Sequence, residues 1–403
     1  MRLKDFTELT PNYNEQPIDG NVSFVPMESL RNGEIDLKEI PFRQAAGKYT
    51  FFANGDLLIA KVTPCFENGN IAIANDLLNG VGFGSSEIFV LRVNKKKALN
   101  TYMFYVSETE DFQGKACATM HGVGGLKRID PLFMRTYEFN LPPLEVQQRI
   151  VSYLDDKTAR IDRAVSLLQK KRDAYTRLKT SIINRAVTRG LNTNVKLKDS
   201  GVEWIGMMPE GWEVKRFKSI FTESKDVSED GSEDLLSVSE YYGVARRADK
   251  MKDGEYESRA ESLVGYKKCK KGDLVVNIML AWKRGLGFSD YDGIVSPSYA
   301  VYMAKNISSH YFHYLMRTNM YVAEYKRNSK GIIDSRLRLY TDRFNNISAI
   351  VPPLSEQQAI AYYLDTHCTR IDHAISIVDK QIDAYTRLKK SLINEVVTGK
   401  RKV

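Results

Sequence analysis

Residues 173–179 read "DAYTRLK", and residues 383–389 repeat the same seven letters. The word lies inside a longer repeat, because residues 141–190 align without gaps with residues 351–400 and about half of the positions are identical. The two copies are 210 residues apart. A repeat of this length indicates a chain built from two related halves.

Each copy has the features of one long helix. The Pro-Pro pairs at 142–143 and 352–353 suit a first helical turn, where a missing N–H costs nothing. Gly190 and Gly399 suit the far ends, where a left-handed backbone is favoured. We therefore expect one helix between each Pro-Pro pair and the glycine that follows it.

Between these ends, apolar residues recur every seven positions, which is the period of a coiled-coil seam. The main column contains Leu154, Ile161, Leu168, Tyr175 and Ile182 in the first copy, and Leu364, Ile371, Val378, Tyr385 and Leu392 in the second. A second column contains Ile150, Ala164 and Leu178, matched by Ile360, Ala374 and Leu388. This pattern predicts that the two helices pack against each other.

The connection between the halves predicts an antiparallel pair. Residues 191–212 are too few to return along a helix of about 65 Å. The region that follows must therefore lie near the C-terminal end of the first helix, where the second helix then starts.

Further apolar residues widen the stripe beyond one partner's width: Val151, Val165, Ala186, Ala361, Ile375, Ile382 and Val396. Two interpretations remain open for this width. Either the helices also pack against the neighbouring domains, or they present a docking surface for helices of partner proteins.

The bulk composition, 43% hydrophobic and 27% charged, is that of a globular protein. Residues 1–17 lack the apolar core of a signal peptide, and no stretch approaches the ~20 apolar residues that span a bilayer. The four cysteines are far apart, which argues against a zinc cluster or a disulfide framework and favours a reducing cytoplasm.

The net charge of +9 suggests a polyanionic partner, although an ordinary solvated surface explains the same balance. The charge is unevenly distributed. Residues 1–140 carry a net −2, residues 141–190 carry +6, residues 191–350 carry +3 and residues 351–403 carry +2.

Faint repeats also link the regions outside the helices. The run "NGDLLIAKV" at 54–62 resembles "KGDLVVNIM" at 271–279, and "GFGSSEIFVLRV" at 82–93 resembles "GIVSPSYAVYMA" at 293–304. These runs, bounded by Gly and Asp, predict strands of a mixed α/β globule. The expected fold class is α+β, with two mixed α/β domains, two long antiparallel coiled-coil helices and a pseudo-two-fold internal repeat.

The expected boundaries follow from the repeat. Residues 1–140 form a first head, 141–190 a first spacer helix, 191–212 a linker, 213–350 a second head and 351–403 a second spacer helix. Two similar heads at a fixed separation suit the reading of duplex DNA, where dimeric proteins contact half-sites about 34 Å apart.

The pattern "PPL…QQ…I…YLD…RID" in both helices resembles the conserved regions of the specificity subunit of type I restriction–modification enzymes. The segment "DSGVEWIGMMPEGWEVKRFK" at 199–218 resembles that family's usual entry to its second target-recognition domain. The resemblance covers essentially the whole chain. One departure is that the first head has no counterpart to "VEWIGMMPEGW".

The resemblance implies a non-catalytic subunit that binds double-stranded DNA, with each head reading one half of a bipartite, asymmetric site. The helices would set the spacing and dock two modification (methyltransferase) subunits. Restriction subunits, which are ATP-dependent translocases and endonucleases, would join the complex. No cofactor is implied in this chain, whereas S-adenosylmethionine, ATP and Mg²⁺ are expected in the partner subunits. The implied location is the cytoplasm, with no membrane contact.

The residues give no sign of catalysis. The chain lacks the G-x-x-x-x-G-K-[ST] phosphate loop, and its five histidines have no metal-ligand spacing, so neither a catalytic residue nor a metal site is predicted. One alternative is a free-standing DNA-modifying enzyme, a methyltransferase or nuclease with an unrecognised motif. Another is a structural spacer with protein-binding heads.

Basic, polar and aromatic residues in predicted loops are the candidate DNA contacts, because such side chains bind phosphates and read base edges. In the first head they are Lys61, Asn68, Asn70, Lys127 and Arg128. In the second head they are Tyr241, Tyr242, Arg246, Arg247, Trp282, Lys283, Arg284, Lys326, Arg327, Lys330, Arg336 and Arg338. A core position is an equal alternative for Trp282. The hypothesis for Arg284 is that its replacement by alanine weakens binding and relaxes only the second half-site.

Overall fold

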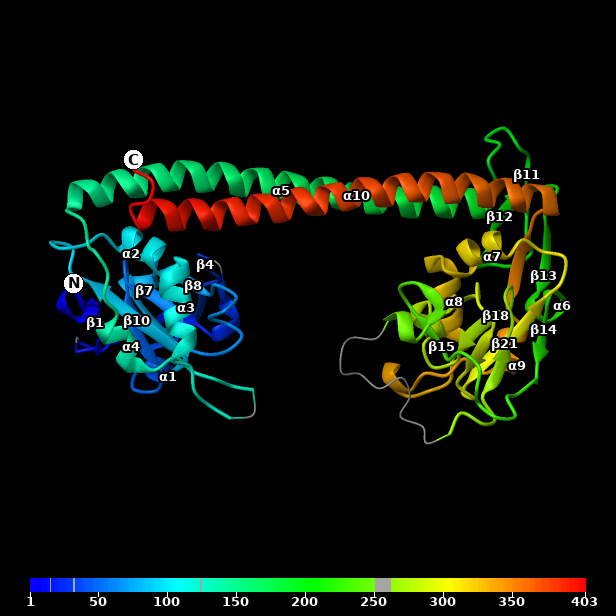
Figure 1. Cartoon of the computed structure of the whole chain (residues 1–403), viewed down its shortest axis with the longest axis horizontal. Helices are drawn as coiled ribbons and strands as arrows, with labels where there is room; N and C mark the ends of the chain where they lie inside the picture. Colours follow the sequence, from blue (N-terminus) through cyan, green and yellow to red (C-terminus); the bar gives the residue numbers. More distant parts are fainter. Residues whose placement is uncertain (15, 32, 124, 251–261) are drawn as a thin grey trace. The chain divides into compact units, whose positions relative to one another are not determined.

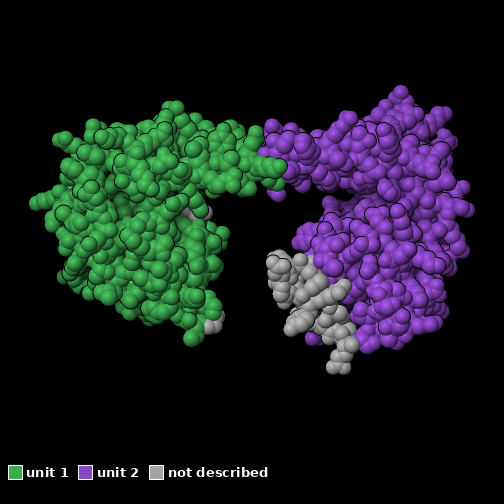
Figure 2. Space-filling view, in the orientation of Figure 1, with its two compact units in different colours: residues 1–170, 379–403 green, residues 171–378 purple. Residues whose placement is uncertain are grey.

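The computed structural model describes residues 1–14, 16–31, 33–123, 125–250 and 262–403. The chain divides into two compact units (Figure 2). Unit 1 contains Met1–Lys170 and Asp379–Val403, and unit 2 contains Lys171–Val378. Each unit therefore combines one globular head with a part of each long helix.

The head of unit 1 is built on two four-stranded sheets (Figure 1). The first sheet is antiparallel, in the order β1-β10-β7-β8, and contains β1 (Thr7–Leu9), β7 (Leu57–Ala60), β8 (Ile71–Ile73) and β10 (Ile88–Val93). The second, in the order β5-β2-β9-β6, contains β2 (Asn21–Val25), β5 (Lys38–Pro41), β6 (Thr50–Ala53) and β9 (Val81–Gly84), with β2 and β9 parallel. Beside short 3₁₀ turns, the other strands and helices in the described part of this head are β3 (Leu30–Arg31), β4 (Glu34–Ile35), α1 (Phe42–Ala45), α2 (Asn100–Ser107), α3 (Glu110–Ala118) and α4 (Pro131–Thr136).

Strand β10 lies at the centre of this head. Its sequence is "IFVLRV", and every residue except Arg92 is buried. Because side chains alternate along a strand, Phe89 and Leu91 join the core that includes α2 and α3. Ile88 and Val90 point the other way, into the core shared with the second sheet. A continuous apolar run is thus explained by burial on both faces.

The head of unit 2 repeats the first sheet. Its antiparallel order is β14-β21-β18-β19, with β14 (Phe221–Ser224), β18 (Leu274–Asn277), β19 (Leu286–Phe288) and β21 (Tyr299–Ala304). Among the described residues of this unit, four two-stranded pairs accompany it: β11 (Leu197–Asp199) with β12 (Met207–Pro209), β13 (Glu213–Arg216) with β22 (Ser348–Val351), β15 (Leu236–Ser239) with β16 (Gly243–Arg246), and β17 (Lys267–Cys269) with β20 (Gly293–Val295). The helices are α6 (Phe217–Ile220), α7 (Ser309–Met316), α8 (Asn319–Asn328) and α9 (Thr341–Asn345).

The two heads share the strand order of this sheet, which confirms the predicted internal repeat and the α+β class. The "GDLL" and "GDLV" runs form β7 and β18, and the second pair of similar runs ends in β10 and β21. These four strands are the two central strands of each sheet.

The long helices are α5 (Leu144–Arg189) and α10 (Leu354–Val397). The Pro-Pro pairs stand just before the first helical residue rather than inside the first turn. Gly190 and Gly399 both have φ of 75°, the left-handed conformation that was expected after a helix end. Among the described residues, no helix is long and apolar enough to cross a membrane.

In each unit, the segments of α5 and α10 are antiparallel. In unit 2, Lys179 lies 2.7 Å from Asp372. At Gly190, directly after the end of α5, a Cβ would lie 2.8 Å from the carboxylate of Glu356. The later position along the first helix is thus next to the earlier position along α10. In unit 1, the corresponding ion pair joins Asp162 to Lys389 at 2.8 Å.

The main column of the predicted seam is largely buried. Leu154, Ile161, Leu364, Ile371, Val378 and Leu392 are buried, and Leu168, Tyr175 and Ile182 are half-buried. Tyr385, however, is 37% exposed. Leu178 and Leu388, which were expected in the second column, are instead 46% and 51% exposed.

The residues that widen the apolar stripe mostly face the heads. Val151 and Val396 are buried in the core of unit 1, and Ala186 and Ala361 are buried in the core of unit 2. Each core also contains helices and strands of the head. Val165 also packs against the core of unit 1, so packing against the heads accounts for five of the seven residues. Ile375 and Ile382 are half-buried and belong to neither core.

A buried glutamine fastens each head to the start of the helix that follows it. Gln147 accepts a hydrogen bond from the N–H of Leu99, and Gln357 accepts one from the N–H of Ser308, both at 2.9 Å. Each glutamine also donates to the carbonyl of the residue five positions earlier, at 2.8 Å. The two glutamines are 0% and 1% exposed.

About two turns further along each helix, a tyrosine of the head donates a hydrogen bond to an aspartate. Tyr105 of α2 donates to Asp155 at 2.6 Å, and Tyr314 of α7 donates to Asp365 at 2.9 Å. Burial, followed by this hydrogen bond, raises the pKa of both tyrosine hydroxyls. The two junctions are thus built from the same residue types at matching positions.

Candidate nucleic-acid interface

Three loops of unit 2 carry most of the contacts predicted for the second head. Loop A is residues 278–285, after β18; loop B is residues 329–338, after α8; and loop C is residues 240–242, between β15 and β16. The N–H of Leu339 donates to the carbonyl of Ile278 at 2.8 Å, so loops A and B are adjacent at their ends. Loops A and C are joined through Arg317.

Loop A contains a tryptophan whose ring lies close to two lysines, one on loop A and one on α8. The indole N–H of Trp282 donates to the carbonyl of Met279 at 3.0 Å. The ammonium groups of Lys283 and Lys326 lie 5.0 and 5.5 Å from centroids of its ring system, which is cation–π distance. Trp282 is half-buried and Lys283 is exposed. The arrangement gathers two cations at the surface where loops A and B meet.

Arg284 is engaged within the protein. Its backbone is left-handed, with φ of 65°. Its Nε donates to the carbonyl of Arg317 at 2.9 Å, and its Nη2 donates to the side chain of Asn319, the first residue of α8. These bonds give Arg284 a role in holding loop A, whether or not it also contacts DNA.

Arg317 is a residue that sequence reasoning missed. Its guanidinium donates to the carbonyls of Arg284 and Leu286 at 2.8 Å and to those of Glu240 and Tyr241 at 2.7 and 3.2 Å. Burial lowers the pKa of this guanidinium, which nevertheless stays charged. Its partners are 31 to 77 residues away in sequence, so no local pattern could reveal the contact.

Loop C projects two aromatic rings. Tyr241 is 84% exposed and Tyr242 is 41% exposed. At the end of β16, Arg246 forms an ion pair with Asp234 at 3.1 Å, and Arg247 is exposed. The ammonium group of Lys250 lies 5.1 Å from the centroid of the Tyr242 ring, so loop C offers exposed rings next to a cation, a combination suited to nucleic acid.

Loop B is a closed hairpin with a basic surface. Lys330 and Arg338 exchange backbone hydrogen bonds, both at 2.9 Å. Lys330 and Arg336 are exposed, whereas Arg338 is half-buried. The stem is anchored because Leu337 and Leu339 are 7% and 0% exposed.

The basic residues at the end of α8 have acidic partners. Lys326 pairs with Asp334 of loop B at 2.9 Å, and Arg327 donates to Glu324 at 2.7 Å. Lys326 therefore links loop B to the Trp282 ring of loop A. Arg327 forms its ion pair within α8 itself.

In the head of unit 1, two predicted cations bind other parts of the protein. Lys61 donates to the carbonyl of Ser86 at 2.7 Å, and burial lowers the pKa of its ammonium group. Arg128 binds the carboxylate of Glu87 with two hydrogen bonds, at 2.8 and 2.9 Å. These hydrogen bonds hold the pKa of Glu87 below its usual value.

The other three candidates of the first head lie in turns nearby. Asn68 is exposed and Asn70 is half-buried in the segment between β7 and β8. Lys127 is exposed, and its backbone N–H donates to the Thr63 hydroxyl at 2.9 Å. Of these three candidates, Lys127 and Asn68 are therefore the ones exposed to solvent.

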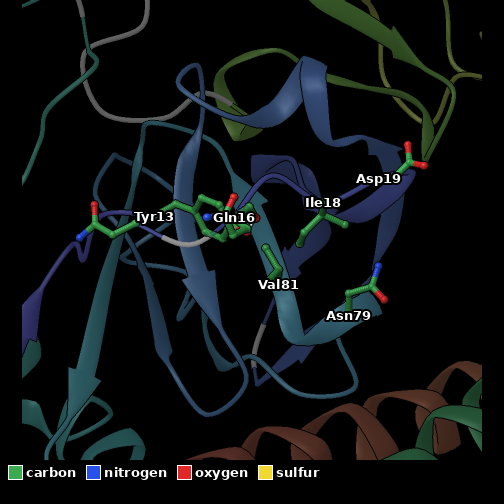
Figure 3. A pocket seen from close by; sticks show the side chains of 7 residues that line it. Tyr13, Gln16, Ile18, Asp19, Asn79 and Val81 are labelled. Atoms are coloured by element: carbon green, nitrogen blue, oxygen red, sulfur yellow. Dashed lines mark hydrogen bonds between the residues drawn. The ribbon is translucent and has the colours of Figure 1, made fainter.

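An open pocket on the first head was not predicted (Figure 3). It is lined by Tyr13, Asn14, Gln16, Ile18, Asp19, Asn79 and Val81. The Tyr13 hydroxyl donates to the carbonyl of Gln16 at 2.6 Å, and its ring packs edge-on against Phe42 and Phe51. Within the described part of the chain, no group of three or more His, Cys, Asp and Glu residues is arranged to hold a metal ion.

Two heads with a common sheet, each followed by a helix that fastens to it in the same way, define a duplicated recognition domain. The family model of the type I restriction modification DNA specificity domain matches residues 1–170 and, a second time, residues 209–378. The chain belongs to this family.

Characterised relatives match to different extents. Over 152 residues the chain is 32% identical to the type I restriction enzyme EcoAI specificity subunit of Escherichia coli, which covers 37% of this chain and 26% of that protein. The EcoEI specificity subunit of Escherichia coli is 30% identical over 154 residues, again 26% of its length. The MjaVIII specificity subunit of Methanocaldococcus jannaschii is 22% identical over 408 residues, covering 96% of this chain and 88% of that protein.

Solved structures share the fold. A chain from a study of complex assembly and conformational transition of the type I R-M system has a TM-score of 0.73 at 15% identity, covering 100% of this chain and 97% of its own. The HsdS subunit from Thermoanaerobacter tengcongensis has a TM-score of 0.52 at 17% identity, covering 100% and 96%.

Proposed function

We propose that this chain is the non-catalytic DNA-recognition subunit of a type I restriction–modification complex, with each head reading one half of a bipartite, asymmetric site. The observation that carries the proposal is the duplication itself. Two heads share one sheet and one mode of attachment to a helix, while their exposed loops differ in sequence. Such a molecule suits a target with two unlike halves.

The second head is proposed to supply the larger share of the DNA contacts made by this chain. Loops A and B bring Lys283, Lys330 and Arg336 to the surface. Arg247 is exposed after β16, and loop C exposes the rings of Tyr241 and Tyr242. In the first head, Lys61 and Arg128 are occupied by protein groups, and the region has a net charge of −2. Partner subunits would supply phosphate contacts on that side.

The helices are proposed to bind two modification subunits, one on the helix segments of unit 1 and one on those of unit 2. Unit 1 exposes Leu167 and Leu388 on its two helix segments, at 60% and 51%. Unit 2 exposes Leu178 and Ile377, at 46% and 44%. Matching apolar residues, one on each helix in each unit, favour two copies of one partner. The double substitutions L167S/L388S and L178S/I377S should each remove one of the two methyltransferase subunits, measured by native mass spectrometry.

The helices are also proposed to set the spacing between the half-sites. Adding four residues, about 6 Å, to both helices should lengthen the unread spacer by about two base pairs. An unchanged spacer in the recognised sequence would contradict this role.

The chemistry is assigned to the partners, so S-adenosylmethionine, ATP and Mg²⁺ would be bound by modification and restriction subunits in the cytoplasm. Methylation-sensitive sequencing of host DNA, with and without this chain, tests the proposal directly. A bipartite motif that is methylated only when the chain is present supports it. Methyl transfer or cleavage by the purified chain alone would favour the alternative, a free-standing DNA-modifying enzyme.

A further inference from the structure

The tip of loop B is apolar and fully exposed. Ile332 is 101% exposed and Ile333 is 53% exposed, yet Leu337 and Leu339 on the same segment are buried. The segment therefore places two of its large apolar side chains in the core and holds two others in solvent. Large apolar side chains in this position indicate a surface that becomes covered on binding.

The loop holds this tip in a fixed conformation. The backbone hydrogen bonds between Lys330 and Arg338 close it, and a 3₁₀ turn at Asp334–Arg336 shapes its far side. Gly331 has φ of +153°, and a Cβ there would lie 2.7 Å from the carbonyl oxygen of Arg336. Only glycine allows this close approach, so the tip is preformed.

The first head contains the same construction. His121 and Arg128 exchange backbone hydrogen bonds, at 3.0 and 2.9 Å. Gly122 has φ of +149°, and a Cβ there would lie 2.3 Å from the carbonyl oxygen of Leu126. Val123 and Leu126 are 90% and 46% exposed. The tips differ in sequence, but both expose two apolar side chains next to a glycine that closes the hairpin.

Cations flank the apolar tip of loop B. Lys330 and Arg336 are exposed on the loop itself, and Lys283 is exposed on the adjacent loop A. Asp334, the acidic residue of the tip, is paired with Lys326. The surface therefore has an apolar tip with positive charges on its sides. It is complementary to a partner whose apolar surface lies between two rows of negatively charged groups. Stacked base pairs between phosphate backbones have this character.

We propose that Ile332 and Ile333 enter the minor groove and wedge between two neighbouring base pairs of the second half-site, while the flanking cations hold the phosphates. Apolar side chains inserted in this way unstack a base step and bend the duplex. Val123 and Leu126 would do the same in the first half-site. The inference rests on the proposed DNA recognition and adds a mode of reading, because steps that unstack easily are favoured at the wedge.

The test uses the full chain, assembled with its methyltransferase subunits, and the bipartite sequence obtained from the methylation experiment. 2-Aminopurine is placed at each adenine of the second half-site in turn, and its fluorescence is measured with protein at saturation. End-labelled DNA reports bending by energy transfer. The variants are I332S/I333S, its counterpart V123S/L126S in the first head, and M303S as a control, because Met303 is 46% exposed on β21 of the same head.

The wild-type complex should raise the fluorescence several-fold at one step. I332S/I333S should abolish this rise, reduce the bend to the part contributed by the first head and weaken binding about tenfold. V123S/L126S and M303S should leave that signal unchanged. Specific, salt-dependent binding without any rise, or an unchanged rise in I332S/I333S, overturns the wedge but leaves the recognition function intact. Loss of methyltransferase subunits from I332S/I333S would assign the tip to protein docking instead. Absence of specific binding by the wild-type complex would overturn the recognition function and the wedge together.

Discussion

Lys179 and Asp372 form an ion pair between α5 and α10, with the ammonium group 2.7 Å from both carboxylate oxygens. Lys389 and Asp162 form the matching pair in unit 1, at 2.8 Å. Each pair joins the last residue of "DAYTRLK" in one copy to the aspartate of "RID" in the other. The DAYTRLK sequence of each helix therefore pairs with the RID sequence of the other helix. This pairing explains why both sequences occur in both copies of the repeat.

Charge reversal should test this pairing. The two side chains are 31% and 55% exposed, so Lys179→Glu is expected to lower the free energy of unfolding by only about 1 kcal/mol, through repulsion of Asp372. Adding Asp372→Lys should restore most of the loss in urea denaturation. Arg177→Glu, at an exposed position of the same helix, is the control. No recovery in the double variant would contradict the assignment.

Gln357→Leu should loosen the second head from α10. The substitution leaves the half-buried N–H of Ser308 and the buried carbonyl of Pro352 without this partner, which costs about 2–3 kcal/mol in the free energy of unfolding. Hydrogen exchange at the Ser308 amide should become faster. Gln147→Leu is the matched variant, and its effect should be confined to the first head. Exchange that is unchanged at Ser308 would exclude this role for Gln357.

Arg317→Gln should release loops A and C together. Hydrogen exchange is expected to rise about tenfold or more at amides of residues 240–243 and 284–286, because one guanidinium holds four carbonyls there. The same amides in Arg317→Lys should show a smaller rise, since an ammonium group cannot reproduce the planar fork. Release of only one loop would show that the two are held separately.

The stability of unit 2 should depend on pH through His313. Burial and the nearby Arg317 lower the pKa of His313 to about 4. The unfolded chain, with a pKa near 6.5, then binds the proton more tightly than the folded chain. Stability from this group is complete above pH ~6.5 and is lost as the pH falls toward 4, by up to about 3 kcal/mol in total.

Urea denaturation between pH 7 and pH 4 measures this effect. His313→Gln should flatten the pH dependence relative to the wild type, whereas His373→Gln, at an exposed position of α10, should not. Equal pH dependence in the wild type and the His313 variant would rule out a contribution from this histidine.

The helices could be predicted from sequence because their signals are local. The Pro-Pro starts, the glycine ends and the seven-residue period all act within a few turns. The second column failed at Leu178 and Leu388 for a geometric reason. Ile150 and Ile360 are buried because they pack in the cores of the two heads, whereas Leu178 and Leu388 belong to neither core and lie on exposed parts of the helices.

The candidate interface could be predicted only in part. The loops that carry Lys283, Lys330 and Tyr241 are exposed, as their polar sequences indicated. The sequence could not show that Arg284 and Lys61 bind carbonyls of the protein, because those partners are 33 and 25 residues away. A search for polar and basic residues also could not identify Ile332 and Ile333 as candidate contacts. Their exposure depends on the backbone conformation of the closed hairpin.

The glutamine junctions have a consequence for how such a chain can evolve. The side chains of Gln147 and Gln357 bind only main-chain atoms of the heads. Such hydrogen bonds do not depend on which side chains the head carries. Apart from one tyrosine in each head and the apolar side chains that pack against the helices, the fastening imposes few demands on the module it holds. New target preferences can therefore arise by wholesale replacement of surface loops, while the anchorage stays intact.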